Sequence, residues 1–190
     1  MRRWVFAFGA FAAASASQPP WWNALLRLER LESPFVQVSD SAVFGAVSRK
    51  GTLRMAKGGR LQVVYETGLR IVADGQTLIQ YDPGTRTAQR MDLKAAARET
   101  PLLALLLEPS RIDRVFKVQF LAEGRVRLEP RQPGLPVVEA EGQGVHLGSL
   151  AWLDPTGARQ VLRLTRPKVP GAFPAGTFSL KVPEGTRWLP

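Results

Sequence analysis

The stretch GTLRMAKGGRLQVVYE, residues 51–66, predicts two antiparallel strands joined by a tight turn. Apolar and polar residues alternate on both sides of Lys57-Gly58-Gly59, as expected for strands with one buried and one solvated face. Glycine supplies the backbone conformations that such a turn requires. The alternation continues in residues 69–74 and 77–82, and a glycine-containing turn separates each pair of strands. The pattern therefore predicts an antiparallel meander.

Two helical segments interrupt the predicted strands. Residues 21–31 place apolar side chains three and four positions apart, and Ser33-Pro34 ends this amphipathic helix. In residues 92–108, Asp92 caps a first helix and Pro101 starts a second one, which carries leucine around nearly its whole circumference. Such a helix must be buried on all sides or occupy an apolar hollow. Further strands are predicted over residues 115–120, 125–129, 137–141, 145–153, 159–165 and 177–182.

The N-terminus has the organisation of a secretory signal. Met1-Arg2-Arg3 is cationic, residues 4–14 are almost wholly apolar, and Ala14-Ser15-Ala16 has the small-x-small form of a cleavage site. This apolar run is shorter than the roughly 20 residues of a membrane-spanning helix. We therefore expect residues 1–16 to be a signal peptide and residues 17–190 to form a single exported domain.

Composition excludes several kinds of chemistry. The 190 residues contain no cysteine and one histidine, His146, so thiol nucleophiles, disulfides and multi-histidine metal sites are absent. No serine lies in a nucleophile-elbow pattern, and no pair of carboxylates stands out. The sequence thus predicts a protein that is not an enzyme and that has no metal or cofactor.

The formal net charge of +10 favours anionic partners. The basic residues are nevertheless dispersed singly along the predicted strands instead of forming dense clusters. We therefore expect no nucleic-acid partner, and we expect the arginines on the solvated face of the sheet.

Several segments resemble the family of periplasmic outer-membrane lipoprotein carriers, LolA. They are the opening stretch 51–66, its continuation 71–82, residues 100–106, Phe35-Val36-Gln37 after the first helix, and the closing segment 177–185. Their order and spacing carry the resemblance, which spans most of residues 24–186. It implies an α+β fold: an unclosed, strongly curved antiparallel β-sheet, or half barrel, with an N-terminal helix and a helical lid over an apolar cavity.

The resemblance and the alternation together define candidate site residues. The predicted acyl-chain cavity is lined from one sheet face by Leu53, Met55, Leu61, Val63, Tyr65, Leu69, Ile71, Ile79 and Tyr81. The predicted lid carries Leu102, Leu103, Leu105 and Leu106. The family has an arginine-proline pair after the strand that corresponds to residues 53–56, and this arginine helps to hold the lid closed. Here Lys57-Gly58 stands at that place, which leaves Lys57 and Arg60 as candidates for the latch.

The resemblance implies a monomeric periplasmic carrier of acylated lipoproteins. It would receive its cargo from an inner-membrane release complex and deliver it to an outer-membrane acceptor. Two alternatives remain open at this stage: a carrier of free lipid or glycolipid on the same fold, and an envelope sensor or interaction domain that recognises acylated proteins without transporting them.

Overall fold

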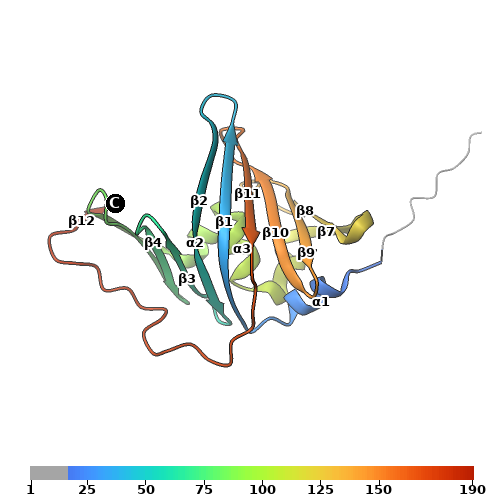
Figure 1. The fold of residues 1–190 in the computed structure, drawn as a ribbon, viewed down its shortest axis with the longest axis horizontal. Coiled ribbons are helices and arrows are strands. Elements are labelled where there is room, and N and C mark those ends of the chain that lie inside the picture. Colours follow the sequence, from blue (N-terminus) through green and yellow to red (C-terminus); the bar gives the residue numbers. More distant parts are fainter. Residues whose placement is uncertain (1–16) are drawn as a thin grey trace, which may run out of the picture.

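A single twisted sheet of twelve strands forms the body of the protein (Figure 1). The computed structural model describes residues 17–190, except the side chains of Glu99, Pro101 and Leu102, so the expected signal peptide lies outside it. The strand order is β12-β6-β5-β4-β3-β2-β1-β11-β10-β9-β8-β7, and only the β12–β6 pair is parallel. This linear order confirms the predicted unclosed, mostly antiparallel sheet.

The strands are β1 (Arg30–Ser41), β2 (Gly45–Ala56), β3 (Arg60–Tyr65), β4 (Arg70–Asp74), β5 (Thr77–Asp82), β6 (Thr87–Asp92), β7 (Phe116–Phe120), β8 (Val126–Pro130), β9 (Val138–Gln143), β10 (His146–Leu153), β11 (Arg159–Leu164) and β12 (Arg187–Leu189). The helices are α1 (Pro20–Leu26), α2 (Leu93–Glu99), α3 (Pro101–Leu106) and α4 (Ile112–Val115), with short 3-10 turns η1 (Pro109–Arg111) and η2 (Ala122–Gly124). No helix within residues 17–190 is long and apolar enough to cross a membrane.

Strand alternation gives the sheet an apolar inner face. Leu53 lies opposite Val63, and Val63 lies opposite Ile71, so these side chains project from the same face. On the other half of the sheet, Leu128 and Leu150 are fully buried. Both halves contribute to one hydrophobic core together with the helices.

Helices cover the inner face because of the order in which the chain visits the strands. β6 lies near one edge of the sheet and β7 forms the other edge, so residues 93–115, which connect them, must cross a face of the sheet. The buried side chains of this connection belong to the same core as the inner-face residues. Helix α1 adds Trp21 and Trp22, whose rings meet edge to face at 5.6 Å.

The first helix is shorter than the sequence predicts. It ends at Leu26, and residues 30–41 form β1, so the predicted stop at Ser33-Pro34 is wrong. Leu31 fits the helical spacing, but it lies opposite Met55 on β2 and is almost fully buried there. Pairing with β2 therefore overrides the local helical pattern.

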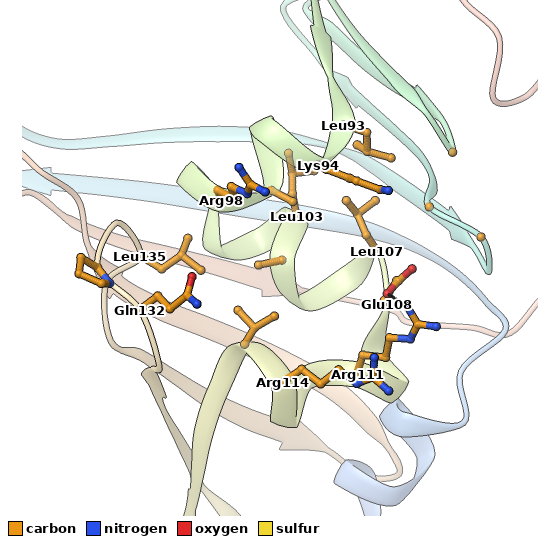
Figure 2. Close-up of a pocket in the computed structure, with 17 residues that line it drawn as sticks. Leu93, Lys94, Arg98, Leu103, Leu107, Glu108, Arg111, Arg114, Gln132 and Leu135 are labelled. Carbon is orange, nitrogen blue, oxygen red and sulfur yellow. Dashed lines mark hydrogen bonds and ion pairs between the residues drawn. The ribbon is translucent and has the colours of Figure 1, made fainter.

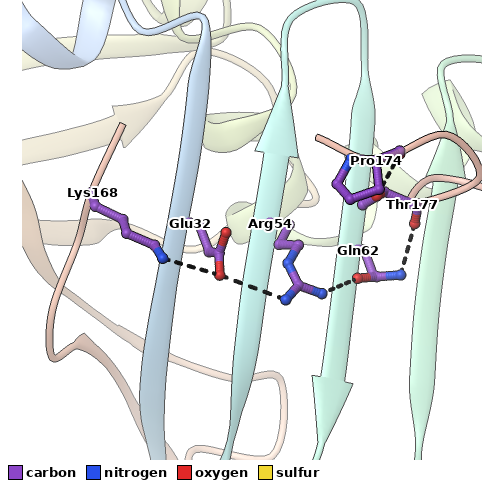
Figure 3. Close-up of polar contacts among 6 residues, drawn as sticks. All are labelled: Glu32, Arg54, Gln62, Lys168, Pro174 and Thr177. Atoms are coloured by element: carbon purple, nitrogen blue, oxygen red, sulfur yellow. Dashed lines mark hydrogen bonds and ion pairs between the residues drawn. The ribbon is translucent and has the colours of Figure 1, made fainter. Parts of the chain in front are cut away.

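The segment 165–186 crosses the outer face on its way from β11 to β12, and a row of polar side chains holds it there (Figure 3). Glu32 Oε1 lies 3.5 Å from both Lys168 Nζ and Arg54 Nη2. Arg54 Nη1 donates to Gln62 Oε1 at 2.8 Å, and Gln62 Nε2 donates to the carbonyl of Thr177 at 2.7 Å. The outer face thus anchors this segment through polar side chains.

The strand predicted over residues 177–182 is wrong, because this part of the segment has no strand structure. Side chains of the sheet hold it in place of backbone hydrogen bonds between strands. Gln62 contacts Thr177, and the guanidinium of Arg60 lies 5.7 Å from the centre of the Phe178 ring. Lys168 forms an isolated antiparallel bridge with Glu32 on β1, and residues 187–189 pair with β6 in parallel.

The β1–β2 hairpin projects beyond the rest of the sheet (Figure 1). At its tip, Val43 and Phe44 are 80% and 85% exposed. Residues 51–56 of β2 pair with β3, whereas residues 45–50 pair only with β1 in the described structure. β1 itself pairs with β11 as far as Asp40, so only the turn at residues 41–45 extends beyond the neighbouring strands.

Gly142 on β9 leaves the space that the Trp21 indole occupies. A Cβ atom at this position would overlap the ring, whose Nε1 donates to the carbonyl of Gly124 at 2.8 Å. Gly171 provides a matched control, because a Cβ there meets nothing within 4 Å and its φ is not positive.

We predict that Gly142→Ala lowers the free energy of unfolding by about 1–3 kcal/mol, because the indole must leave its position. Gly171→Ala should change it by no more than about 0.5 kcal/mol. Urea unfolding followed by tryptophan fluorescence measures both. Equal stability of the two variants would contradict the assigned packing of Trp21.

Candidate functional site

The candidate site begins with α2, which follows directly from β6. Asp92 caps the helix, since its Oδ1 accepts a hydrogen bond from the amide of Ala95 at 2.9 Å. The amide of Leu93 donates to the carbonyl of Gln76 at 2.9 Å, and the Leu93 and Ala96 side chains are buried. The start of this helix is therefore fixed to the sheet, as the predicted Asp92 cap requires.

A break at Thr100-Pro101 separates α2 from α3. Thr100 is extended, with φ −120° and ψ 110°, and Pro101 occupies the first turn of α3. Four leucines in and directly after α3 are no more than 8% exposed: Leu103, Leu105, Leu106 and Leu107. The all-round apolar helix predicted from sequence is thus buried on several sides; the side chain of Leu102 lies outside the description.

The sheet residues predicted to line a cavity divide into two groups. Leu53, Met55, Leu61 and Val63 lie on the inner face and are almost fully buried in the core that contains the α3 leucines. Tyr65 and Ile71 are partly buried against the same core, and Leu69 lies half-buried in the turn before β4. In this conformation, the leucines of residues 103–107 pack where the sequence predicts an acyl-chain cavity.

The prediction that Ile79 and Tyr81 share this face is wrong. Ile79 lies opposite Val72 and Arg90, and Tyr81 lies opposite Arg70, all on the outer face. The inner-face residue of this strand is Leu78, which is 3% exposed. Apolar residues of β5 lie on both faces of the sheet, so the alternation alone could not decide which of them face inward.

An open hollow of about 590 Å³ lies beside the buried leucines (Figure 2). Its apolar lining comes mainly from the helical connection and from the loop before β9, and comprises Leu93, Ala97, Leu103, Ala104, Leu107, Val115, Pro133 and Leu135. Gly58, Gly59 and Gly75 contribute backbone from two hairpin turns. The hollow therefore gives solvent access to the flank of α3.

Basic side chains surround this hollow. Lys94 and Arg98 come from α2, and Arg111 and Arg114 come from η1 and α4. The carboxylate of Glu108 lies 3.2 Å from Arg111. The site thus combines an apolar lining with a cationic rim.

The inner face becomes polar toward the hairpin end of the sheet. Tyr65 donates its hydroxyl hydrogen to Gln37 Oε1 at 2.8 Å, and Gln37 Nε2 donates to Gln160 Oε1 at 3.3 Å. Gln160 Nε2 in turn donates to Ser39 Oγ at 2.7 Å and to Asp154 Oδ2 at 2.9 Å. This network ends the apolar part of the inner face. Burial raises the pKa of Tyr65, and the nearby positive charge of Arg49 opposes this shift.

Neither latch candidate makes an ion pair or hydrogen bond with α2 or α3 among the described side chains. Lys57 Nζ lies 4.0 Å from Glu29, and Arg60 lies on the outer face against Phe178. The latch therefore remains a prediction without a contact that supports it in this conformation.

Sequence reasoning missed the hollow and its basic rim. Lys94 and Arg98 are four residues apart, and Arg111 and Arg114 are three apart, so each pair shares a side of its local helical segment. These spacings flank the leucine-rich run and are the signal that the sequence offered. The predicted leucine-rich helix includes Leu107, but the predicted lid residues do not, although Leu107 is buried and lines the hollow.

A family model described as "Outer membrane lipoprotein carrier protein LolA" matches residues 27–181. The chain belongs to the LolA family. The resemblance of the sequence to this family is thus confirmed. A search of curated proteins found no match.

One solved structure shares the fold of this LolA family member at a TM-score above 0.5, and two others match it at lower scores, all at low sequence identity. An uncharacterized conserved protein from Thermus thermophilus is 13% identical with a TM-score of 0.51, and the match covers 89% of this chain and 94% of that one. A putative outer membrane lipoprotein-sorting protein domain from Vibrio parahaemolyticus is 9% identical with a TM-score of 0.49, covering 85% and 96%. A LolA superfamily protein from Nitrosomonas europaea is 9% identical with a TM-score of 0.47, covering 87% and 99%.

The raised pKa of Tyr65 can be tested in a Tyr81→Phe variant, because the chain has two tyrosines. We expect its remaining phenol to ionise above the ordinary value of about 10, which the same variant should show when unfolded in denaturant. Because the unfolded state loses this proton first, stability should fall as pH rises above about 10. Tyrosinate absorbance gives both midpoints; a folded midpoint at or below the unfolded one would contradict burial of Tyr65.

Proposed function

We propose that this protein is a periplasmic carrier that binds the acyl chains of lipoproteins and transfers them from the inner to the outer membrane. Membership of the LolA family supports the carrier role, since the family model describes outer-membrane lipoprotein carriers. The carrier would receive its cargo from an inner-membrane release complex and deliver it, as a monomer, to an outer-membrane acceptor.

The observation that carries the proposal is the leucine-rich connection packed on the inner face. Leu105 and Leu106 are fully buried among sheet residues that could equally contact a hydrocarbon chain. The N-cap residue Thr100 makes no side-chain hydrogen bond to the start of α3, and its extended backbone separates α3 from α2. Displacement of α3 would therefore break few directional interactions and would open an apolar surface.

Burial of an acyl chain and burial of the leucines of residues 103–107 involve free energies of similar size. Burial of a chain of roughly 16 carbons stabilises a complex by about 12 kcal/mol at about 0.8 kcal/mol per CH₂. Exposure of four leucines costs about 1.5–3 kcal/mol each, or about 6–12 kcal/mol together. Exchange of α3 for an acyl chain would thus be close to balanced, as a carrier that must release its cargo requires.

The hollow beside α3 supports a route for the ligand. Leu103 and Leu107 line it and also belong to the buried core. An acyl chain that enters the hollow would meet these two side chains first. In the proposed mechanism, it would then replace them against the inner-face residues Leu53, Met55, Leu61 and Val63.

Transfer of a synthetic triacylated lipopeptide from inner-membrane to outer-membrane vesicles tests the function. Leu103→Glu should reduce lipopeptide binding about tenfold or more, because it places a charge where the chain would lie. Leu153→Glu is the matched control, since Leu153 is 58% exposed at the far end of β10, and it should bind as the unchanged protein does.

Circular dichroism of both variants is the control for folding, and we expect spectra like that of the unchanged protein. Equal binding by the two folded variants would contradict the assigned ligand position. A protein that binds the lipopeptide but never delivers it would be a sensor and not a carrier.

Displacement of α3 can be measured directly because the chain has no cysteine. Leu105→Cys and Ala73→Cys each introduce a single thiol at a position that is 0% exposed, the first on α3 and the second on β4. We expect lipopeptide binding to speed maleimide labelling of Leu105→Cys about tenfold or more and to leave Ala73→Cys protected. Unchanged labelling of both thiols at saturating lipopeptide would contradict a mobile α3.

A further inference from the structure

We propose that the hollow beside α3 binds a negatively charged head group, so that the preferred ligand is an anionic amphiphile. This inference rests on the proposed acyl-chain binding and adds the charge of the ligand's polar end. The chemistry that the hollow would recognise is a phosphate or carboxylate attached to an acyl chain.

Two pairs of cations face one another across the apolar lining (Figure 2). Lys94 and Arg98 project from α2, four residues apart, and Arg111 and Arg114 project from the opposite wall. All four side chains are exposed at the rim. Like charges around one hollow repel one another, and an anion placed between them relieves this repulsion.

Few acidic groups compensate these cations. Glu108 is the acidic residue that lines the hollow, and its carboxylate lies 3.2 Å from Arg111. Lys94, Arg98 and Arg114 form no ion pair with any side chain that the structure describes. A ligand carboxylate or phosphate could therefore accept hydrogen bonds from Arg98 and Arg114 without displacing a protein carboxylate.

The apolar lining lies between the two cationic walls and includes Leu103 and Leu107. A head group held at the rim would leave its acyl chain next to these leucines. The hollow thus matches both ends of an amphiphile: charge at its edge and hydrocarbon at its floor.

The test compares four ligands with the same palmitoyl chain below their micellar concentrations: palmitate, lysophosphatidylglycerol, lysophosphatidylcholine and monopalmitoylglycerol. Competition with a fluorescent fatty-acid probe measures their affinities. We expect the two anionic ligands to bind about tenfold more tightly than the two ligands without net charge at low salt, with a difference that shrinks as salt increases. Tighter binding of lysophosphatidylglycerol than of palmitate would identify phosphate as the preferred anion, and the reverse order would identify carboxylate.

The variant Arg98→Gln/Arg114→Gln should lower the affinity for both anionic ligands about tenfold and change the affinity for monopalmitoylglycerol less than twofold. The control Arg159→Gln/Arg163→Gln removes the same charge from exposed positions on β11, away from the hollow, and should leave all four affinities unchanged.

Two results would contradict the inference and leave the proposed function standing. The first is a neutral ligand that binds as tightly as the anionic ones, and the second is an equal loss of affinity for the anionic ligands in both double variants. Absence of binding by every palmitoyl ligand and by the lipopeptide would instead remove the proposed function itself.

Discussion

Burial of the leucines of residues 103–107 against the inner face is the interaction on which the rest of the structure depends. An unclosed sheet of this width presents a continuous apolar face that must be covered. The cover comes from the chain segment that runs from β6, near one edge of the sheet, to β7 at the other. Topology and the hydrophobic effect therefore require this segment to present apolar side chains to the sheet.

The two faces of the sheet hold their covering segments by different forces. On the inner face, the connection between β6 and β7 is held mainly by non-directional apolar contact, which another hydrocarbon could replace. On the outer face, the segment 165–186 is held by directional contacts of Glu32, Arg54 and Gln62 with Lys168 and Thr177. In the proposed mechanism, this difference makes the inner cover, and not the outer one, the element that exchanges with a ligand.

Alternation predicted most strands because a half-buried strand needs apolar residues at every second position. It failed at β5, where Leu78 and Ile79 are both apolar and the pairing with β4 decided which one faces inward. Helical spacing likewise extended the first helix through Leu31, whereas pairing with Met55 assigns that residue to β1. Residues 177–182 alternate like a strand, but no neighbouring strand pairs with them in the described structure, and side chains hold them instead.

The sequence by itself determined the antiparallel meander, the all-round apolar helix and the absence of cysteine chemistry, because these depend on residue type and local spacing. Tertiary structure decided which residues of β5 face inward, the position of residues 165–186 on the outer face, and the placing of Arg98 and Arg114 around one hollow. These features join residues that are far apart in the chain or choose between two equally apolar phases. Local spacing carries no information on such choices, since strand pairing and burial of the whole inner face decide them.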